Sequence, residues 1–430
     1  MLSKEENELL TRVGAGTVMG DLLRQYWLPA VVSEELPEPD GAPMRIRLLG
    51  EDLIAFRDTN GRVGLIQNHC PHRGASLFFG RNEEAGLRCV YHGWKFDAQG
   101  NCIDMPNEPA ESDFKSKVKA VAYPTLERGG VVWAYMGPRT EPPALPELEW
   151  MAVPAENRVM SKTLRECNWV QALEGDIDTA HLYFLHSRIE SPDTAYVASD
   201  PGVFHEDRHP RLHLVRTDYG LMYGAQRDQD EDHYYWRITQ FMMPIHTLFP
   251  PGGLGGVPGH IWVPIDDEHT MVWFLIWNPA GPAGPVEHGL FGSHPESYLP
   301  NTSDPLGQWR YVANRTNDYQ IDREMQRTKT YTGIPTIPLQ DQAITESMGP
   351  IYDRNQEHLG STDAMVIQVR RRLLDAACAL REEGITPPGV DHPEQYRVRT
   401  ASVVLDRGAD WQAATQEVLK AFSGLPVANA

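Results

Sequence analysis

The 430-residue sequence lacks several features that mark large classes of protein. It has no run of eighteen apolar residues, so we expect no membrane-spanning helix. The first six residues include three charged ones and lack the apolar core of a secretion signal. No Gly-x-Gly-x-x-Gly fingerprint follows a predicted strand, so a nicotinamide or flavin domain is not evident. Redox chemistry in this chain would therefore need an external electron donor.

Cysteine is scarce, and basic residues are outnumbered by acidic ones. Of the five Cys residues, the three outside the motif described below, Cys102, Cys167 and Cys378, are too scattered to form a disulfide framework. This favours a reducing compartment, and we expect the cytoplasm. A net charge of −20 argues against partners such as nucleic acid or an anionic membrane. The length allows two or more domains.

Two Cys/His doublets carry the clearest chemical signal. Cys70-Pro71-His72 is followed, after sixteen residues, by Cys89-Val90-Tyr91-His92. A [2Fe–2S] cluster with two Cys on one iron and two His on the other takes this ligand set from two neighbouring loops. A structural zinc could use the same residues, although zinc fingers usually pair Cys with Cys and His with His. Four unrelated loop residues are the remaining alternative.

The surroundings of the doublets favour the cluster. Gly and Pro residues next to them let a backbone fold tightly around a metal group and aim amides at its sulfurs. The stretches 70–77 and 89–96 closely resemble the cluster-binding loops of Rieske proteins. This resemblance implies four cluster ligands, Cys70, His72, Cys89 and His92. His69 lies outside the spacing and is expected to be a surface or outer-layer histidine.

Local patterns predict the elements around this motif. Ser3 and Glu6 form a capping box that starts a helix to about Val13, and a second helix is expected at 19–26. Strands are expected at 44–49, 52–57, 63–66, 130–135, 212–215, 234–240 and 271–277, and late helices at 362–381 and 410–422. The proline-rich stretch 138–146 is the best linker. We therefore expect a helical cap (1–40), a strand-rich domain (41–145) and a larger mixed domain (146–430).

A second candidate metal site lies in segment 168–186, which we expect to be helical. Asp178 and His181 are three residues apart and would share a helix face. His186, five residues after His181, fits the same ion only if the helix loosens there. Two His and one carboxylate form the facial triad that keeps Fe(II) open to O₂. Alone, the pattern is weak evidence, and ordinary core or surface histidines are its default interpretation.

Such a segment after a Rieske motif resembles the α subunits of Rieske non-heme iron ring-hydroxylating oxygenases. Stretches 13–17, 171–178 and 349–354 indicate the phthalate 4,5-dioxygenase-like branch. The resemblance implies an α+β fold: an antiparallel Rieske [2Fe–2S] domain, then a catalytic domain with an antiparallel sheet flanked by helices (helix-grip-like). It implies that His181 and His186 bind a mononuclear Fe(II), with a carboxylate at the start of a late helix. Asp341 fits that place best and Asp353 is the second choice; Glu346, Glu357 and Asp363 are expected to be surface or capping groups.

The same resemblance gives Asp178 a role between subunits. It implies that one subunit's cluster lies against its neighbour's mononuclear iron. Asp178 would then accept N–H bonds from His181 and from a cluster histidine of the adjacent chain, coupling the two centres. A ring-like trimer or hexamer follows, because each subunit donates at one surface and receives at another. A separate flavin/iron–sulfur reductase is expected to supply electrons from NADH.

The expected function is therefore a terminal oxygenase that uses O₂ and reductase-supplied electrons to hydroxylate an aromatic carboxylic acid, as a phthalate-type dioxygenase does. An O-demethylase of a methoxylated aromatic or lignin-derived biaryl acid is the alternative within the family. A non-catalytic Rieske electron carrier is the alternative outside it.

An aromatic acid substrate needs a cation for its carboxylate, and Arg suits a bidentate grip. The sequence leaves open which strand-region cations line the pocket: Arg208, Arg211, Arg216, Arg227 and Arg237, or His205, His209, His213, His246 and His260. The apolar run 241–245 is expected to be ordinary core.

Overall fold

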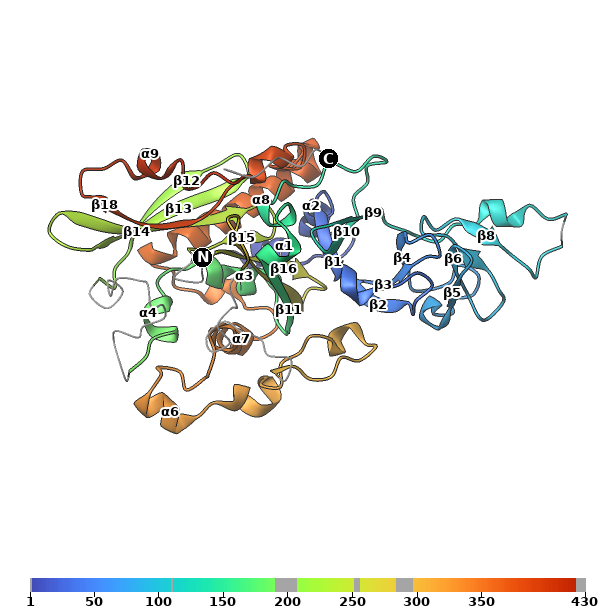
Figure 1. The fold of residues 1–430 in the computed structure, drawn as a ribbon, viewed down its shortest axis with the longest axis horizontal. Helices are drawn as coiled ribbons and strands as arrows, with labels where there is room; N and C mark the ends of the chain where they lie inside the picture. The colour runs from blue at the N-terminus through green and yellow to red at the C-terminus, as the bar shows by residue number, and fades with distance from the viewer. Residues whose placement is uncertain (1, 110, 190–206, 251–255, 284–296, 423–430) are drawn as a thin grey trace.

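The computed structural model describes residues 2–109, 111–189, 207–250, 256–283 and 297–422. A strand-rich N-terminal part projects along the long axis from a larger body of helices and sheet (Figure 1). The helices of the described ranges include none that is both long and apolar enough to cross a membrane. The α+β class with antiparallel sheets is confirmed.

Three small antiparallel sheets make up the projecting part. In sheet order, they consist of β2 (Met44–Leu48), β3 (Glu51–Arg57) and β4 (Val63–Gln67); β5 (Arg81–Glu83), β6 (Gly86–Arg88), β7 (Lys95–Phe96) and β8 (Cys102–Asp104); and β1 (Trp27–Val32), β10 (Val131–Tyr135) and β9 (Thr125–Arg128). The strands predicted near 44–66 and 130–135 are confirmed to within a residue or two.

The predicted N-terminal cap is helical over a shorter range than 1–40. Helix α1 (Lys4–Thr11) begins with the predicted capping box, in which Ser3 and Glu6 exchange backbone hydrogen bonds of 2.8 and 3.0 Å. After α2 (Val18–Leu23), residues 27–32 form β1 and pair with the buried strand β10. Burial of this apolar run between sheets decides its conformation. The domain boundaries themselves stay a prediction.

An eight-stranded antiparallel sheet forms the centre of the larger part. Its order is β11 (Arg158–Arg165), β17 (Thr270–Trp277), β16 (Val257–Pro264), β15 (His246–Leu248), β14 (His233–Met242), β13 (Gly220–Asp228) and β12 (Arg211–Arg216), with β18 (Ala401–Asp406) also paired to β14. The predicted run 241–245 is core, as expected. In the Gly/Pro-rich stretch 250–259, residues 251–255 lie outside the described ranges, and β16 begins at Val257.

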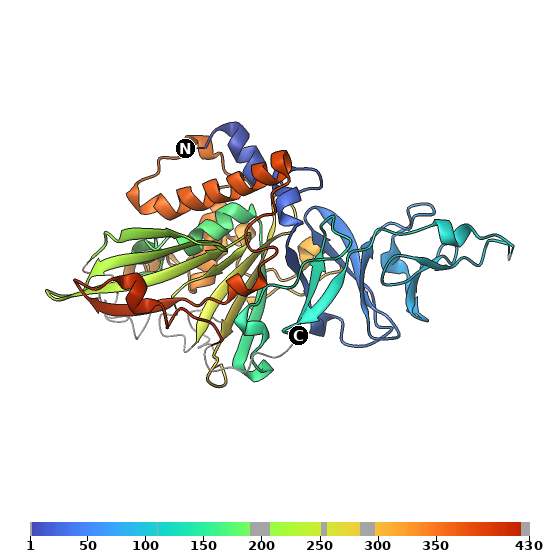
Figure 2. The same cartoon turned by 90° about the horizontal axis from the view of Figure 1, so that it is seen from above.

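Helices cover the sheet. Helix α8 (Ala364–Glu383) lies beside α1 along one face (Figure 2) and is capped by Gly384, whose φ of +69° is in the left-handed region that favours glycine. The remaining helices are α3 (Trp169–Ile177), α4 (Leu182–Leu185), α6 (Arg323–Thr328), α7 (Ile337–Ser347) and α9 (Trp411–Thr415). The predicted helix 410–422 is wrong beyond Thr415, because Lys420 and Ala421 bond to the backbone of 397–398 instead.

A buried ion network joins α3 to α8. Arg370 on α8 makes paired hydrogen bonds with Glu174 on α3, at 2.6 and 2.9 Å, and with Glu357. Arg354 adds a contact of 3.5 Å to Glu174. Burial raises the pKa of Glu174, but the two guanidinium groups outweigh it and hold the pKa below its usual value. Glu174 is therefore a carboxylate at neutral pH, and it fixes the helix that leads into the second metal segment.

Replacing Arg370 with Met should lower the free energy of unfolding by about 3–5 kcal/mol, since two buried carboxylates lose their partner. The exposed pair Arg327–Glu324 provides the control, and Arg327→Met should cost less than about 1 kcal/mol. Urea denaturation followed by circular dichroism measures both. Equal small losses in the two variants would contradict the importance of the buried network.

Candidate metal centres and substrate pocket

The two doublets occupy loops of the same geometry. In each loop the amide of the Cys donates to a carbonyl five residues on, at 2.8 Å, and the glycine four residues on donates back to the Cys carbonyl, at 2.9 Å. Gly74 and Gly93 take these equivalent places with φ of +75° and +80°. A residue with a side chain would be strained there, so glycine shapes both loops. The repeated turn presents one Cys and one His from each loop.

The four predicted cluster residues come together at the end of the projecting part. Cys70 and Cys89 are each 3 % exposed, and the rings of His72 and His92 meet edge to face with centroids 4.4 Å apart. Trp94 stacks on His72 at 4.3 Å. The Nδ1 atom of His72 is buried with no hydrogen-bond partner in the described part of the chain. An orphaned ring nitrogen beside two buried thiols fits a metal cluster and has no other evident purpose.

Burial raises the pKa of the Cys70 thiol to about 11, and the neighbouring Cys89 adds to the shift. A nearby positive charge, such as that of a metal, would be needed to hold it as the thiolate ligand. His69, by contrast, bonds the carbonyl of Gly74 at 3.0 Å from an exposed position, as its place outside the spacing predicted.

The second metal segment is not one helix. Helix α3 ends at Ile177, Asp178 has extended backbone angles (φ −102°, ψ 110°), and the short helix α4 begins only at Leu182. The expectation that Asp178 and His181 share a helix face is therefore wrong. The break lies before His181, whereas the helix was expected to loosen between His181 and His186. Between the two histidines α4 is a single turn that ends at Leu185, and the two rings still meet edge to face with centroids 5.0 Å apart.

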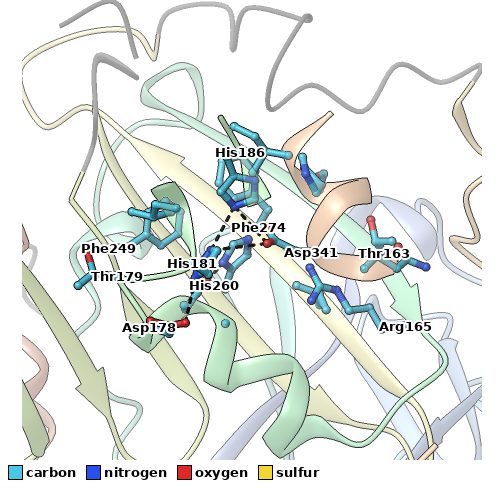
Figure 3. A pocket seen from close by; sticks show the side chains of 18 of the residues that line it. Thr163, Arg165, Asp178, Thr179, His181, His186, Phe249, His260, Phe274 and Asp341 are labelled. Carbon is cyan, nitrogen blue, oxygen red and sulfur yellow. Dashed lines mark hydrogen bonds and ion pairs between the residues drawn. The ribbon is translucent and has the colours of Figure 1, made fainter. Parts of the chain in front are cut away.

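Three electron-rich atoms converge at that place (Figure 3). The two Nε2 atoms of His181 and His186 lie 3.1 Å apart, and Oδ1 of Asp341 lies 3.8 and 3.2 Å from them. Asp341 comes from α7, so the site joins distant parts of the sequence. Burial raises the pKa of Asp341, but His186 and His181 outweigh it and leave the pKa at about 2. The carboxylate is therefore charged at neutral pH.

Outer contacts fix which nitrogen of each imidazole faces inward. Gln340 donates its amide N–H to the carbonyl of Ile334 at 2.8 Å, so its Oε1 must accept from Nδ1 of His186, at 2.6 Å. Asp178 lies 3.5 Å from Nδ1 of His181. Both histidines thus present Nε2 lone pairs toward each other and toward Asp341. A metal ion between the three atoms, or a proton on one imidazole, turns this repulsion into attraction, and two imidazoles with one carboxylate fit a metal ion.

The other late acids have separate partners. The second-choice ligand Asp353 caps a turn through Asn355 and Gln356 at the surface. Glu357 pairs with Arg370, and Asp363 accepts from the amide of Gly360. Glu346 is buried but bonds Tyr319 and Gln342. Of the five candidates, the structure brings only Asp341 to the histidines.

Asp178 and His181 influence each other. Burial raises the pKa of Asp178, yet the bond and charge of His181 lower it below its ordinary value. Burial lowers the pKa of His181, and Asp178, followed by Asp341, raises it above its ordinary value. The remaining oxygen of Asp178 accepts from the amide of Ala180 at 2.7 Å.

A pocket opens beside the three convergent residues, and the sheet supplies its wall. Residues directly opposite on neighbouring strands project to the same face. Ser161 of β11 pairs with Phe274 of β17, which pairs with His260 of β16. Two steps along β11 bring Thr163 and then Arg165 to the same wall, and Phe249 closes another side (Figure 3). The pocket is thus partly aromatic, and polar and charged side chains make up much of the rest of its lining.

Arg165 is a pocket residue that the sequence reasoning missed. It is 5 % exposed, lines the pocket, and has no carboxylate within ion-pair distance in the described part of the chain. Its contacts are Thr345 at 3.4 Å and the ring of Trp262 at 5.1 Å. The alternation of Ser161, Thr163 and Arg165 with buried residues was a usable strand signal, placed just before the metal segment.

The cations that the sequence did suggest are mostly elsewhere. Arg237 and His260 line the pocket, whereas Arg227 is buried and donates to the carbonyl of Thr179. Arg208, Arg211, Arg216, His209 and His213 are exposed, His246 is buried outside this pocket, and His205 lies outside the described residues.

Comparison with known families covers both parts of the chain. The Rieske [2Fe–2S] domain family matches residues 26–123, and the family described as "LigXa C-terminal domain like" matches residues 134–424. The chain is 43 % identical to the 3-chlorobenzoate-3,4-dioxygenase oxygenase subunit of Comamonas testosteroni, over 97 % of this chain and 98 % of that protein. It is 40 % identical to the phthalate 4,5-dioxygenase oxygenase subunit of Pseudomonas putida, over 96 % and 94 %.

Other relatives include an oxygenase subunit named for a different reaction, O-demethylation. The 5,5'-dehydrodivanillate O-demethylase oxygenase subunit of Sphingobium sp. is 34 % identical over 87 % of this chain and 80 % of that protein. Among solved structures, dicamba monooxygenase bound to dicamba shares the fold, with a TM-score of 0.56 at 18 % identity over 83 % of this chain and 99 % of that one. Matches to oxygenases along nearly the whole length set aside a non-catalytic electron carrier and a zinc-stabilised module. The chain belongs to the Rieske non-heme iron oxygenases, as the terminal oxygenase (α) subunit.

Proposed function

We propose that His181, His186 and Asp341 hold the mononuclear Fe(II) of this oxygenase. The observation that carries the proposal is the convergence of two imidazole lone pairs and a carboxylate within 4 Å of one another. Three protein ligands on one side of an iron leave coordination positions open for O₂. Activation of O₂ is the chemistry that such an ion would supply when bound. The protein's part is to hold the ligands, through Gln340 and Asp178, and to shape a pocket next to them.

Cys70, His72, Cys89 and His92 are the proposed ligands of the [2Fe–2S] cluster. Two matching loops, two buried thiols and the orphaned nitrogen of His72 support this assignment. Histidine ligation raises the potential of such a cluster relative to an all-cysteine one. A separate NADH-dependent flavin/iron–sulfur reductase is the proposed electron source. The reduced state of the five cysteines supports a cytoplasmic location.

The two proposed metal centres lie in separate parts of the molecule, which supports electron transfer between subunits. The strands of the cluster loops lie at the tip of the projecting part, away from α4 and α7 (Figure 1). Val90 and Tyr91, beside the cluster ligands, are 58 % and 55 % exposed, so the tip offers apolar surface to another chain. We propose a ring-like trimer or hexamer in which Asp178 bridges His181 and a cluster histidine of the neighbouring subunit.

The proposed substrate is an aromatic carboxylic acid. Phe249 and Phe274 supply aromatic walls, and Arg165 supplies a buried guanidinium with no carboxylate within ion-pair distance in the described ranges. A buried cation of this kind is stabilised by an anionic ligand. Phthalate-type dioxygenation is the first choice, supported by the two dioxygenase relatives. O-demethylation of a methoxylated or biaryl acid is the second, supported by the O-demethylase relative.

Product analysis tests the proposed function. The purified oxygenase, with a surrogate reductase and NADH, is offered phthalates, chlorobenzoates, methoxybenzoates and biaryl acids under O₂. A cis-dihydrodiol supports dioxygenation, and a phenol with formaldehyde supports O-demethylation. Absence of any oxygenated product from all four classes would contradict an aromatic acid oxygenase.

His181→Ala should remove one iron and leave the cluster. Iron content should fall from about three to about two per chain, with the visible spectrum of the cluster unchanged and turnover abolished. His392→Ala is the matched control, because this histidine is exposed and contacts neither site; it should keep three irons. Retained turnover in His181→Ala would refute the ligand assignment.

Asp178→Asn should leave both metals bound but slow electron delivery at least tenfold, since an amide bridges two imidazoles less well than a carboxylate. The rate of cluster oxidation in a single turnover, with substrate and O₂ added to reduced enzyme, measures this. Asp353→Asn, at a half-buried acid that caps a short turn away from the two histidines, is the control. A rate equal to that of the unaltered enzyme would count against the bridge.

Arg165→Gln should raise the Kd for benzoate-type acids by about 10- to 100-fold, because a charged hydrogen-bonded pair contributes roughly 1.5–3 kcal/mol. Titration calorimetry on the oxidised enzyme measures the Kd without turnover. Arg158→Gln, at the other end of the same strand and outside the pocket, should leave it unchanged. An unchanged Kd in Arg165→Gln would show that the carboxylate lies elsewhere.

A further inference from the structure

The pocket contains a second histidine–aspartate pair that the iron site does not use. Nδ1 of His260 lies 2.7 Å from Oδ2 of Asp176, and both residues line the pocket. Asp176 precedes the break in α3, on the last turn of the helix, whereas His260 is in the middle of β16. The pair is therefore built across two elements and lies next to, but separate from, the ligands of the proposed iron.

A chain of hydrogen bonds fixes the pair. Trp262 donates its indole N–H to the hydroxyl of Thr247 at 2.8 Å, which leaves that hydroxyl to donate to Oδ2 of Asp176 at 2.5 Å. Trp262 and Thr247 are both buried. Because the carboxylate acts only as an acceptor, Nδ1 of His260 is the donor to it. The imidazole therefore presents Nε2 on its other edge.

The ring itself is held on several sides. Phe249 stacks on it at 5.2 Å, and the rings of Trp262 and Phe274 lie at 4.9 and 5.3 Å. The side chain keeps 18 % of its surface exposed, and Nε2 has no hydrogen-bond partner in the described part of the chain. A purely structural histidine would have both nitrogens satisfied, whereas this one keeps one nitrogen available in a ligand pocket.

We propose that His260, positioned by Asp176, binds a second oxygen substituent of the aromatic acid, a further carboxylate or a phenolic hydroxyl, while Arg165 binds the first carboxylate. The inference rests on the proposed aromatic acid substrate and adds how the pocket distinguishes one acid from another. A neutral imidazole accepts a hydrogen bond from a hydroxyl at Nε2, and a protonated one donates to a carboxylate. A hydrogen or halogen at that ring position leaves the imidazole unsatisfied, so such acids bind less well.

Titration calorimetry on the oxidised holoenzyme tests this with four probes: benzoate, 3-chlorobenzoate, phthalate and 3-hydroxybenzoate. For the unaltered enzyme, phthalate or 3-hydroxybenzoate should bind at least about tenfold more tightly than benzoate. His260→Leu should remove this preference and leave the Kd of benzoate within about threefold. His260→Gln, which keeps a hydrogen-bonding group, should restore part of it. Which of the two oxygen-bearing probes is preferred identifies the substituent.

Two further variants separate positioning from structure. Thr247→Val removes one donor to Asp176 and should reduce the preference without abolishing benzoate binding. His213→Leu, at an exposed histidine of the same sheet, should change nothing. An unaltered enzyme with no preference, or a His260→Leu variant that loses affinity equally for every probe, would overturn the inference while leaving the proposed function intact. Failure of the unaltered enzyme to bind any of the four acids would instead contradict the proposed function.

Discussion

The mutual repulsion of three electron-rich atoms is the constraint on which this structure depends. Nε2 of His181, Nε2 of His186 and Oδ1 of Asp341 face one another from two separate segments. Such an arrangement costs free energy unless a cation lies between the atoms. Gln340 and Asp178 hold the imidazoles in place, and Glu174, locked by Arg370, fixes the helix that precedes them. Much of the catalytic part thus serves to keep these atoms together.

The pocket lies next to this site, and the projecting part that carries the cluster loops lies away from it. The sheet wall runs alongside the three ligands, so any molecule bound by Arg165 and His260 lies next to them. The strands that flank the cluster loops, by contrast, lie in the projecting part (Figure 1), and Val90 and Tyr91 beside the cluster ligands are exposed. A chain with its proposed cluster and its proposed iron site in separate parts is suited to electron transfer between two subunits. Asp178 lies in the break before His181 and lines the pocket beside the proposed iron site.

Sequence reasoning located the chemistry better than the scaffold. The Cys/His spacing and the resemblance it supports named all seven proposed metal ligands, because ligand types and spacing are local properties. The break at Asp178 was not foreseen, since a loosening was expected only between His181 and His186. Residues 27–32 became a strand and 416–422 left the helix, since pairing with distant segments outweighed their local patterns. Arg165 was missed because its place in the pocket depends on strand register, which links it to Phe274 and His260. Among the suggested cations, only tertiary contacts separated Arg237 and His260 from exposed ones.

Anomalous X-ray diffraction at the iron absorption edge, from crystals of anaerobically purified protein, tests the central claim most directly. The account predicts a pair of iron peaks between the loops at 70–75 and 89–94 and a single third peak between His181, His186 and Asp341. A third peak that is absent, or that responds at the zinc edge instead, would contradict the assignment of this site to an oxygen-activating iron.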